Sequence, residues 1–134
     1  MKKLIGPFVL AFGIFSFSLV AGMPSDVQGA EQELRPMQKI MQARIGWVKA
    51  MNSNLGAMNY DEIKKDALAL SSQAAAVAEK QPEGLAKELT VRLSTLASAT
   101  AEATGRKNNE AIQMKLAEIQ ATCAECHAKI RDKK

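Results

Sequence analysis

The chain has 134 residues, with 18 Lys and Arg against 14 Asp and Glu, and its net charge is +4. This length fits one small domain, and an apolar share of 47% excludes a disordered chain. Two cysteines are too few for a small protein that depends on many disulfides.

Residues 1–30 are predicted to be a signal peptide. A positively charged start at residues 1–3 precedes an apolar stretch over residues 4–21. We favour cleavage near Ala30, because charged helical sequence follows it. An uncleaved membrane anchor is the alternative, since the stretch approaches the ~20 residues that span a bilayer. We therefore expect export to the periplasm and a mature domain over residues 31–134.

The charge of this mature region argues against a nucleic-acid-binding protein. Loss of Lys2, Lys3 and Asp26 leaves a net charge of only +3. A dedicated nucleic-acid binder would show a concentrated basic face. No segment after residue 30 is apolar enough to cross a membrane, so we expect no stable membrane insertion once the signal is removed.

Four helices are predicted, because apolar residues recur every three or four positions. The first covers residues 31–52 and is followed by a turn over residues 54–59. The second begins with Asp61 as its cap and runs to Lys80, and Pro82 suits the first turn of a third helix that ends near Gly105.

The fourth helix begins at Asn108 or Asn109, either of which is a suitable N-cap. It has the clearest apolar stripe, which consists of Ile112, Leu116, Ile119, Cys123, Cys126 and Ile130. No stretch alternates strongly enough for a strand. Helices of similar length joined by short turns indicate an all-α, antiparallel four-helix bundle with up-down-up-down topology.

The expected core lacks bulk. All four phenylalanines lie between Phe8 and Phe17, and many helix contact positions are Ala or Ser. A buried prosthetic group would supply the missing volume. Met51, Met58 and Met114 are interpreted as core packing residues, and core packing is also the default for Trp47.

One motif indicates chemistry. The sequence Cys123-Ala124-Glu125-Cys126-His127 is C-x-x-C-H, the attachment sequence of c-type haem. Each thiol can add to one vinyl group of the porphyrin, and His127 can coordinate the iron. A dithiol site normally follows a strand, zinc normally needs four ligands, and a disulfide between helical residues at this spacing would be strained. These alternatives are weaker than haem c.

The signal peptide, the helical pattern and the late C-x-x-C-H motif resemble the cytochrome c-prime family, the class II c-type cytochromes. The resemblance covers residues 31–134. It implies a four-helix bundle with one haem c near the C-terminus of the last helix. It also implies thioether links to Cys123 and Cys126 and iron coordination by His127.

The segment Leu34–Met41 resembles that of low-spin members, in which a first-helix methionine completes the iron coordination. The resemblance implies Met37 as the sixth ligand, with Met41 as the alternative. High-spin members leave this site open and bind NO or CO, and that arrangement also stays open here. Arg35 is interpreted as a solvated residue rather than a partner of a haem propionate.

We therefore expect a periplasmic mono-haem electron carrier with His/Met ligation, exchanging electrons with redox proteins, and not an enzyme. The alternative is a five-coordinate cytochrome c-prime that binds NO or CO, and a haem-free dithiol protein is a third reading. The basic residues Lys129, Arg131, Lys133 and Lys134 either complement the helix dipole or steer an acidic partner. A homodimer is left open.

Overall fold

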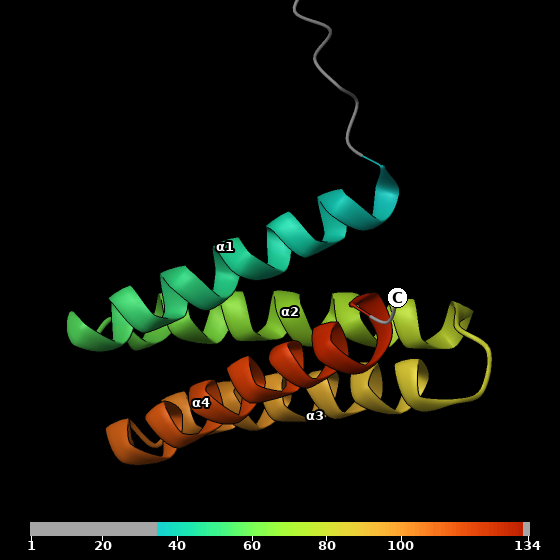
Figure 1. Ribbon diagram of the computed structural model, residues 1–134. Helices are drawn as coiled ribbons and strands as arrows, with labels where there is room; N and C mark the ends of the chain where they lie inside the picture. The colour runs from blue at the N-terminus through green and yellow to red at the C-terminus, as the bar shows by residue number, and fades with distance from the viewer. Residues whose placement is uncertain (1–34, 133–134) are drawn as a thin grey trace, which may run out of the picture. The chain divides into compact units, whose positions relative to one another are not determined.

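The computed structural model describes residues 35–132, which belong to the unit Leu34–Lys134. The predicted signal peptide and its cleavage site lie outside the described residues. Four α-helices make up this region: α1 (Pro36–Gly56), α2 (Tyr60–Lys80), α3 (Leu85–Gly105) and α4 (Asn109–Cys126). A π-helical turn, η1 (His127–Arg131), continues α4, and residues 35–132 contain no strand. The prediction of four helices is confirmed (Figure 1).

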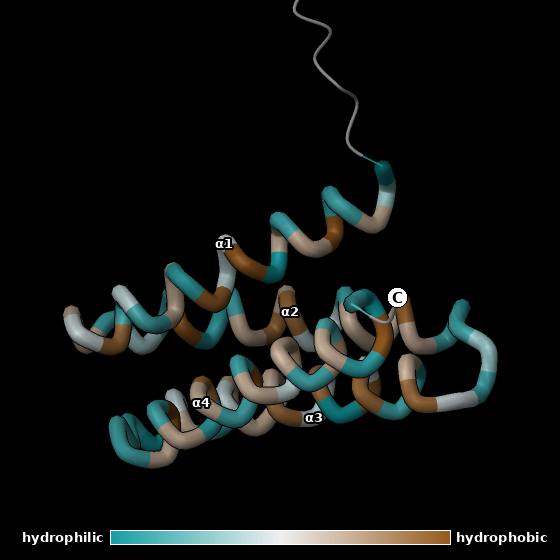
Figure 2. The backbone as a smooth tube through the Cα atoms, viewed as in Figure 1, coloured by the Kyte–Doolittle hydropathy of each residue, from teal (hydrophilic) through white to brown (hydrophobic). Residues whose placement is uncertain are grey.

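The helices pack mainly on their neighbours in the chain. The most extensive contact joins α2 to α3, followed by that of α3 with α4, while α1 packs less extensively on α2 and α4. Figure 2 shows apolar and polar segments alternating along each helix, as expected for helices that bury one face. None of the helices within residues 35–132 is long and apolar enough to cross a membrane.

The core is aliphatic, and α1 contributes least to it. Fully buried side chains include Ile63 and Leu70 of α2 and Ile112, Leu116 and Ile119 of α4. Only Met51 and Arg44 are buried in α1, whereas α3 alone buries nine residues. The apolar side of α1 is therefore incompletely covered by protein.

The methionine predictions had mixed outcomes. Met51 is fully buried, as expected, but Met58 and Met114 are 64% and 54% exposed, so their assignment to the core was wrong. Met58 occupies the α1–α2 loop with a positive φ of 55°, and its side chain is largely exposed there. Trp47 packs against the core cluster while remaining partly exposed, in agreement with a packing role.

Helix boundaries differ from the predictions at two loops. α1 continues to Gly56, because Leu55 packs against the core and so stabilises one more helical turn. α3 begins only at Leu85, since Gly84 has a φ of +140° that a helix cannot include. Pro82 therefore lies in the preceding loop and not in the first turn of the helix.

The caps of α2 and α4 lie close together. Asn59, not Asp61, is the N-cap residue of α2. Asn108 caps α4, its side-chain oxygen accepting a hydrogen bond from the Ala111 amide at 3.0 Å. The Tyr60 hydroxyl donates to Asn109 Oδ1 at 2.7 Å and so links the two helix starts.

The π turn changes the last part of the predicted stripe. In η1 the amide of Asp132 donates to the carbonyl of His127 at 2.9 Å, a five-residue spacing instead of the four of an α-helix. The wider turn therefore rotates the side chains after His127 away from the face that the α-helical stripe occupies. Ile130 is 39% exposed as a result and does not extend the buried face.

Candidate functional site

A cavity of about 290 Å³ lies between α1, α3 and α4. Ile45 and Val48 of α1 face Leu89 and Leu93 of α3 across it, so its lining is mainly apolar. Ligand pockets in proteins begin at roughly 300 Å³ and have the same mainly apolar character with a few polar groups. The cavity therefore has the size and lining of a small binding pocket, and it occupies the side of α1 that the core leaves uncovered.

The C-x-x-C-H motif lines this cavity from one side. Cys123 and Cys126 come from the last turns of α4, and His127 is the first residue of η1. Both thiols are free and partly buried. Spacings of three and four residues bring these side chains toward one side of the helix, so the fold directs all three into a single apolar space.

The Cys123 thiol is held in a partly desolvated environment. Burial raises the pKa of Cys123, the positive charge of Arg44 lowers it, and Cys126 raises it further. The neutral thiol therefore dominates at neutral pH. Cys123 therefore has to lose its proton before it can act as a nucleophile. A redox dithiol site, in contrast, holds an activated thiolate.

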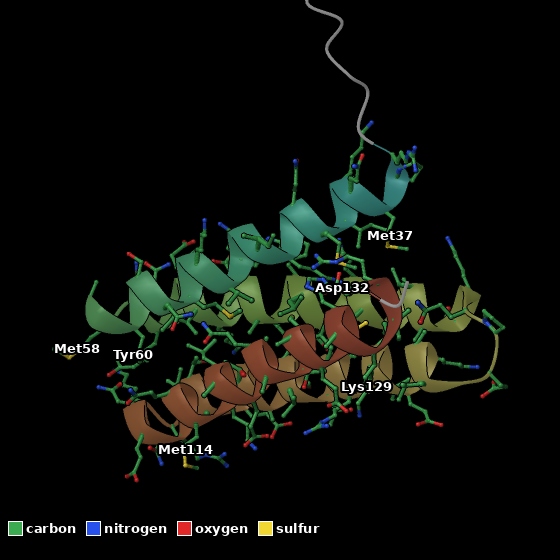
Figure 3. All side chains as sticks on the ribbon, viewed as in Figure 1. Met37, Met58, Tyr60, Met114, Lys129 and Asp132 are labelled. Carbon is green, nitrogen blue, oxygen red and sulfur yellow. The ribbon has the colours of Figure 1, made fainter. Side chains whose placement is uncertain are left out.

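The two candidate methionines have different surroundings. Met41 lines the cavity from α1, together with the three motif residues. Met37 is 49% exposed and is not one of the cavity-lining residues. In the view of Figure 3, Met37 extends from the first turns of α1 toward the end of the chain near Asp132. The structure thus brings Met41, and not Met37, to the same cavity as His127.

A buried arginine on α1 also lines the cavity. Arg44 is only 7% exposed, and its Nε donates a hydrogen bond to Gln73 Oε1 of α2 at 2.9 Å. Its Nη2 is buried and has no hydrogen-bond partner among the residues described. Burial lowers the pKa of Arg44, while the nearby thiols of Cys123 and Cys126 raise it.

Sequence reasoning missed Arg44, although a signal was present. The residues Met41, Arg44, Val48 and Met51 follow the three- and four-residue steps of one helix face. A charged residue within an otherwise apolar stripe indicates a buried ion or a binding residue. Arg35, by contrast, is exposed at the start of α1, where its backbone amide donates to Gln38 Oε1 at 2.9 Å.

The basic residues after the motif form local ion pairs. Lys129 Nζ lies 2.6 Å from Glu125 Oε1, and Arg92 of α3 lies 3.4 Å from the other oxygen of the same carboxylate. Arg131 pairs with Asp132 at 2.6 Å. The hydrogen bond from Lys129 lowers the pKa of Glu125, so this carboxylate stays ionised. Lys133 and Lys134 lie outside the described residues.

Comparison with protein-family models, curated proteins and solved structures finds no match to this chain.

The arrangement suits an apolar group better than a free metal ion. No cluster of three or more His, Cys, Asp or Glu side chains within residues 35–132 could hold a metal ion. The thiols of Cys123 and Cys126 and the imidazole of His127 instead line a cavity large enough for a small molecule. The thioether of Met41 and the guanidinium of Arg44 line the same cavity from α1. These donors can link covalently to a large apolar group and coordinate a metal that this group carries.

Proposed function

We propose that the chain is a mono-haem c-type cytochrome that transfers electrons between redox proteins in the periplasm. The observation that supports this most strongly is the convergence of Cys123, Cys126 and His127 on one apolar cavity. Haem c would form thioether bonds to the two cysteines, and His127 would be one ligand of its iron. When bound, the haem supplies one-electron chemistry between ferric and ferrous iron.

The proposed architecture is that of the class II c-type cytochromes, which the sequence resembles. An antiparallel, up-down-up-down bundle agrees with short loops and with packing between helices adjacent in the chain. A haem near the C-terminus of the last helix agrees with the position of the cavity beside the last turns of α4.

We propose Met41 as the sixth iron ligand, in place of Met37, the residue that the resemblance implied. Met41 and His127 line one cavity from different helices, while the side chain of Met37 is half exposed. A thioether ligand opposite histidine favours ferrous iron and raises the potential. The lining around it is mainly apolar, which suits a carrier whose coordination does not change with its oxidation state.

Two of the basic residues close to the motif are expected to contribute little net charge to the partner surface. Lys129 and Arg131 are both paired with carboxylates there. We therefore propose that redox partners dock with little long-range electrostatic steering from these two residues. The proposed periplasmic location rests on residues 1–30, which the structure does not describe.

The test is a visible spectrum of the exported protein, produced together with a haem-attachment system. Spectra are recorded for the oxidised protein, the reduced protein and the reduced protein with CO. We expect low-spin bands that CO leaves unchanged in the native chain and in Met37→Ala. We expect Met41→Ala to become high-spin and to bind CO.

The other outcomes discriminate between the alternatives. The opposite behaviour of the two variants would identify Met37 as the ligand. A native chain that is already high-spin and binds CO would favour the five-coordinate, gas-binding alternative. An absence of haem absorbance, or haem that survives denaturation in Cys123→Ala/Cys126→Ala, would refute the proposed attachment.

A further inference from the structure

The positive charge of the described residues is concentrated at α1. Residues 35–59, which hold the N-cap, the helix and the following loop, contain four basic residues and no Asp or Glu. Residues 60–132 contain ten basic and eleven acidic residues and so have a net charge of −1. The net positive charge of residues 35–132 therefore arises entirely from α1 and its N-cap.

Three of these four basic residues lie on one exposed face of α1. Arg35, Lys39 and Lys49 are exposed, as are Gln42 and Gly46 between them. These positions follow one another in steps of three and four residues, which keeps them on one side of the helix. None of the ion pairs found within residues 35–132 involves Arg35 or Lys49. We refer to this surface as the basic face, and it extends about 20 Å along the helix axis.

The basic face borders the mouth of the cavity. Lys49 belongs to the face and also lines the cavity, and Ile45 lines the cavity while remaining 51% exposed. Figure 1 shows α1 at one side of the four helices. The basic residues after the motif, Lys129 and Arg131, are paired with carboxylates instead. A partner on the basic face would therefore lie beside the cavity and meet the positive charge of Lys49 there.

The chemistry of the basic face suits a protein better than a membrane or a nucleic acid. A helix that binds a membrane inserts a continuous apolar face, whereas Met37 and Ile45 are the only large apolar side chains exposed on α1. Duplex DNA carries one negative charge per about 1.7 Å of its axis, which three cations over about 20 Å match poorly. Carboxylates three or four residues apart on a protein helix are about 5–6 Å apart, a spacing closer to that of the cations.

We propose that the basic face of α1 is a docking surface for a partner protein that presents an acidic patch. Charge complementarity steers the partner to α1 and orients it beside the cavity. One helix face is a small contact, and small contacts are typical of weak, transient complexes such as those between electron-transfer proteins. Docking itself does not require haem, whereas a redox role of the partner rests on the proposed function.

The experiment uses the full exported chain, with and without attached haem. A fluorescently labelled, N-acetylated oligoglutamate peptide is the acidic probe, and oligoglutamine of the same length is its uncharged counterpart. Binding is measured by fluorescence anisotropy at low and at physiological ionic strength. A carbodiimide then joins carboxylates of the bound probe to adjacent lysines as amides, and mass spectrometry identifies those lysines.

Arg35→Gln/Lys49→Gln removes two charges from the basic face, and circular dichroism first establishes that it is helical. We expect it to weaken oligoglutamate binding by roughly threefold to thirtyfold at low ionic strength, and by less at physiological ionic strength, where exposed charges are screened. Lys64→Gln/Lys80→Gln is the matched control. It removes two exposed charges from α2, which has four acidic residues of its own, and should change the affinity by less than about twofold. In the native chain, cross-links should form at Lys39 and Lys49.

Three results would overturn the proposal: equal affinities of the two double variants, cross-links at lysines of α2 instead of α1, or equal binding of oligoglutamine. Phosphatidylglycerol vesicles and single-stranded oligothymidylate are tested in parallel, and tighter binding of either one through the basic face would assign that face to a membrane or a nucleic acid instead. Self-association in analytical ultracentrifugation that Arg35→Gln/Lys49→Gln abolishes would assign it to a second copy of the chain. Exported protein without attached haem would refute the haem function, while oligoglutamate binding would still decide the docking surface.

Discussion

Replacement of Arg44 by methionine should stabilise the haem-free chain. In the haem-free chain, Nη2 is buried without a partner, and an unsatisfied buried donor costs about 1–3 kcal/mol. Arg44→Met removes that cost with a side chain of similar length. It also breaks the hydrogen bond to Gln73, which contributes about 1 kcal/mol, but the half-buried Gln73 can bind water instead.

The net expectation is a gain of about 1 kcal/mol in the haem-free chain, which corresponds to a rise in Tm of roughly 4–8 °C for a domain of this size. Thermal unfolding followed by circular dichroism measures this shift. Lys49→Met is the control and should leave Tm unchanged, since Lys49 is exposed. A lower Tm for haem-free Arg44→Met would refute the reasoning.

Three further predictions concern the scaffold and the motif. Leu116→Ala should lower the free energy of unfolding by about 2–5 kcal/mol in urea titrations, whereas exposed Met114→Ala should change it little; equal effects would contradict the assigned core. Asn108→Ala should cost about 1 kcal/mol through loss of the cap on α4, and an unchanged urea midpoint would show that the cap is dispensable. Because burial raises the pKa of Cys123, its alkylation by iodoacetamide at neutral pH should be slower in the native haem-free chain than in the urea-unfolded chain, and the difference should diminish as pH rises and the buried thiol ionises. Faster alkylation in the native chain would indicate an activated thiolate instead.

The helices could be predicted from sequence because their determinants are local. Apolar periodicity and polar caps act within a few residues, and Asn108 indeed caps α4. Their ends were less predictable, since they depend on tertiary contacts or on one backbone conformation. Leu55 extends α1 by packing on the core, and the positive φ of Gly84 delays α3 beyond Pro82.

The site could be predicted only as far as its residues are close in sequence. The C-x-x-C-H spacing alone brings Cys123 and Cys126 to one side of the last helix, and the structure adds a cavity there. The choice between Met37 and Met41 depends on where α1 approaches α4, which no local pattern encodes. The position of Arg44 on an apolar stripe is visible in the sequence, but its hydrogen-bond partner lies 29 residues away on another helix and is not.

The small share of buried residues in α1 has a consequence for the order of assembly. Because α1 buries only Met51 and Arg44, it is the helix that can separate from the others at the lowest free energy. Its detachment would open the cavity while α2, α3 and α4 kept their mutual contacts. A porphyrin could then reach the two thiols from the side, before α1 closed over it. In the proposed cytochrome, maturation would proceed as docking of one helix onto a preformed three-helix platform, and haem insertion and completion of the fold would be a single event.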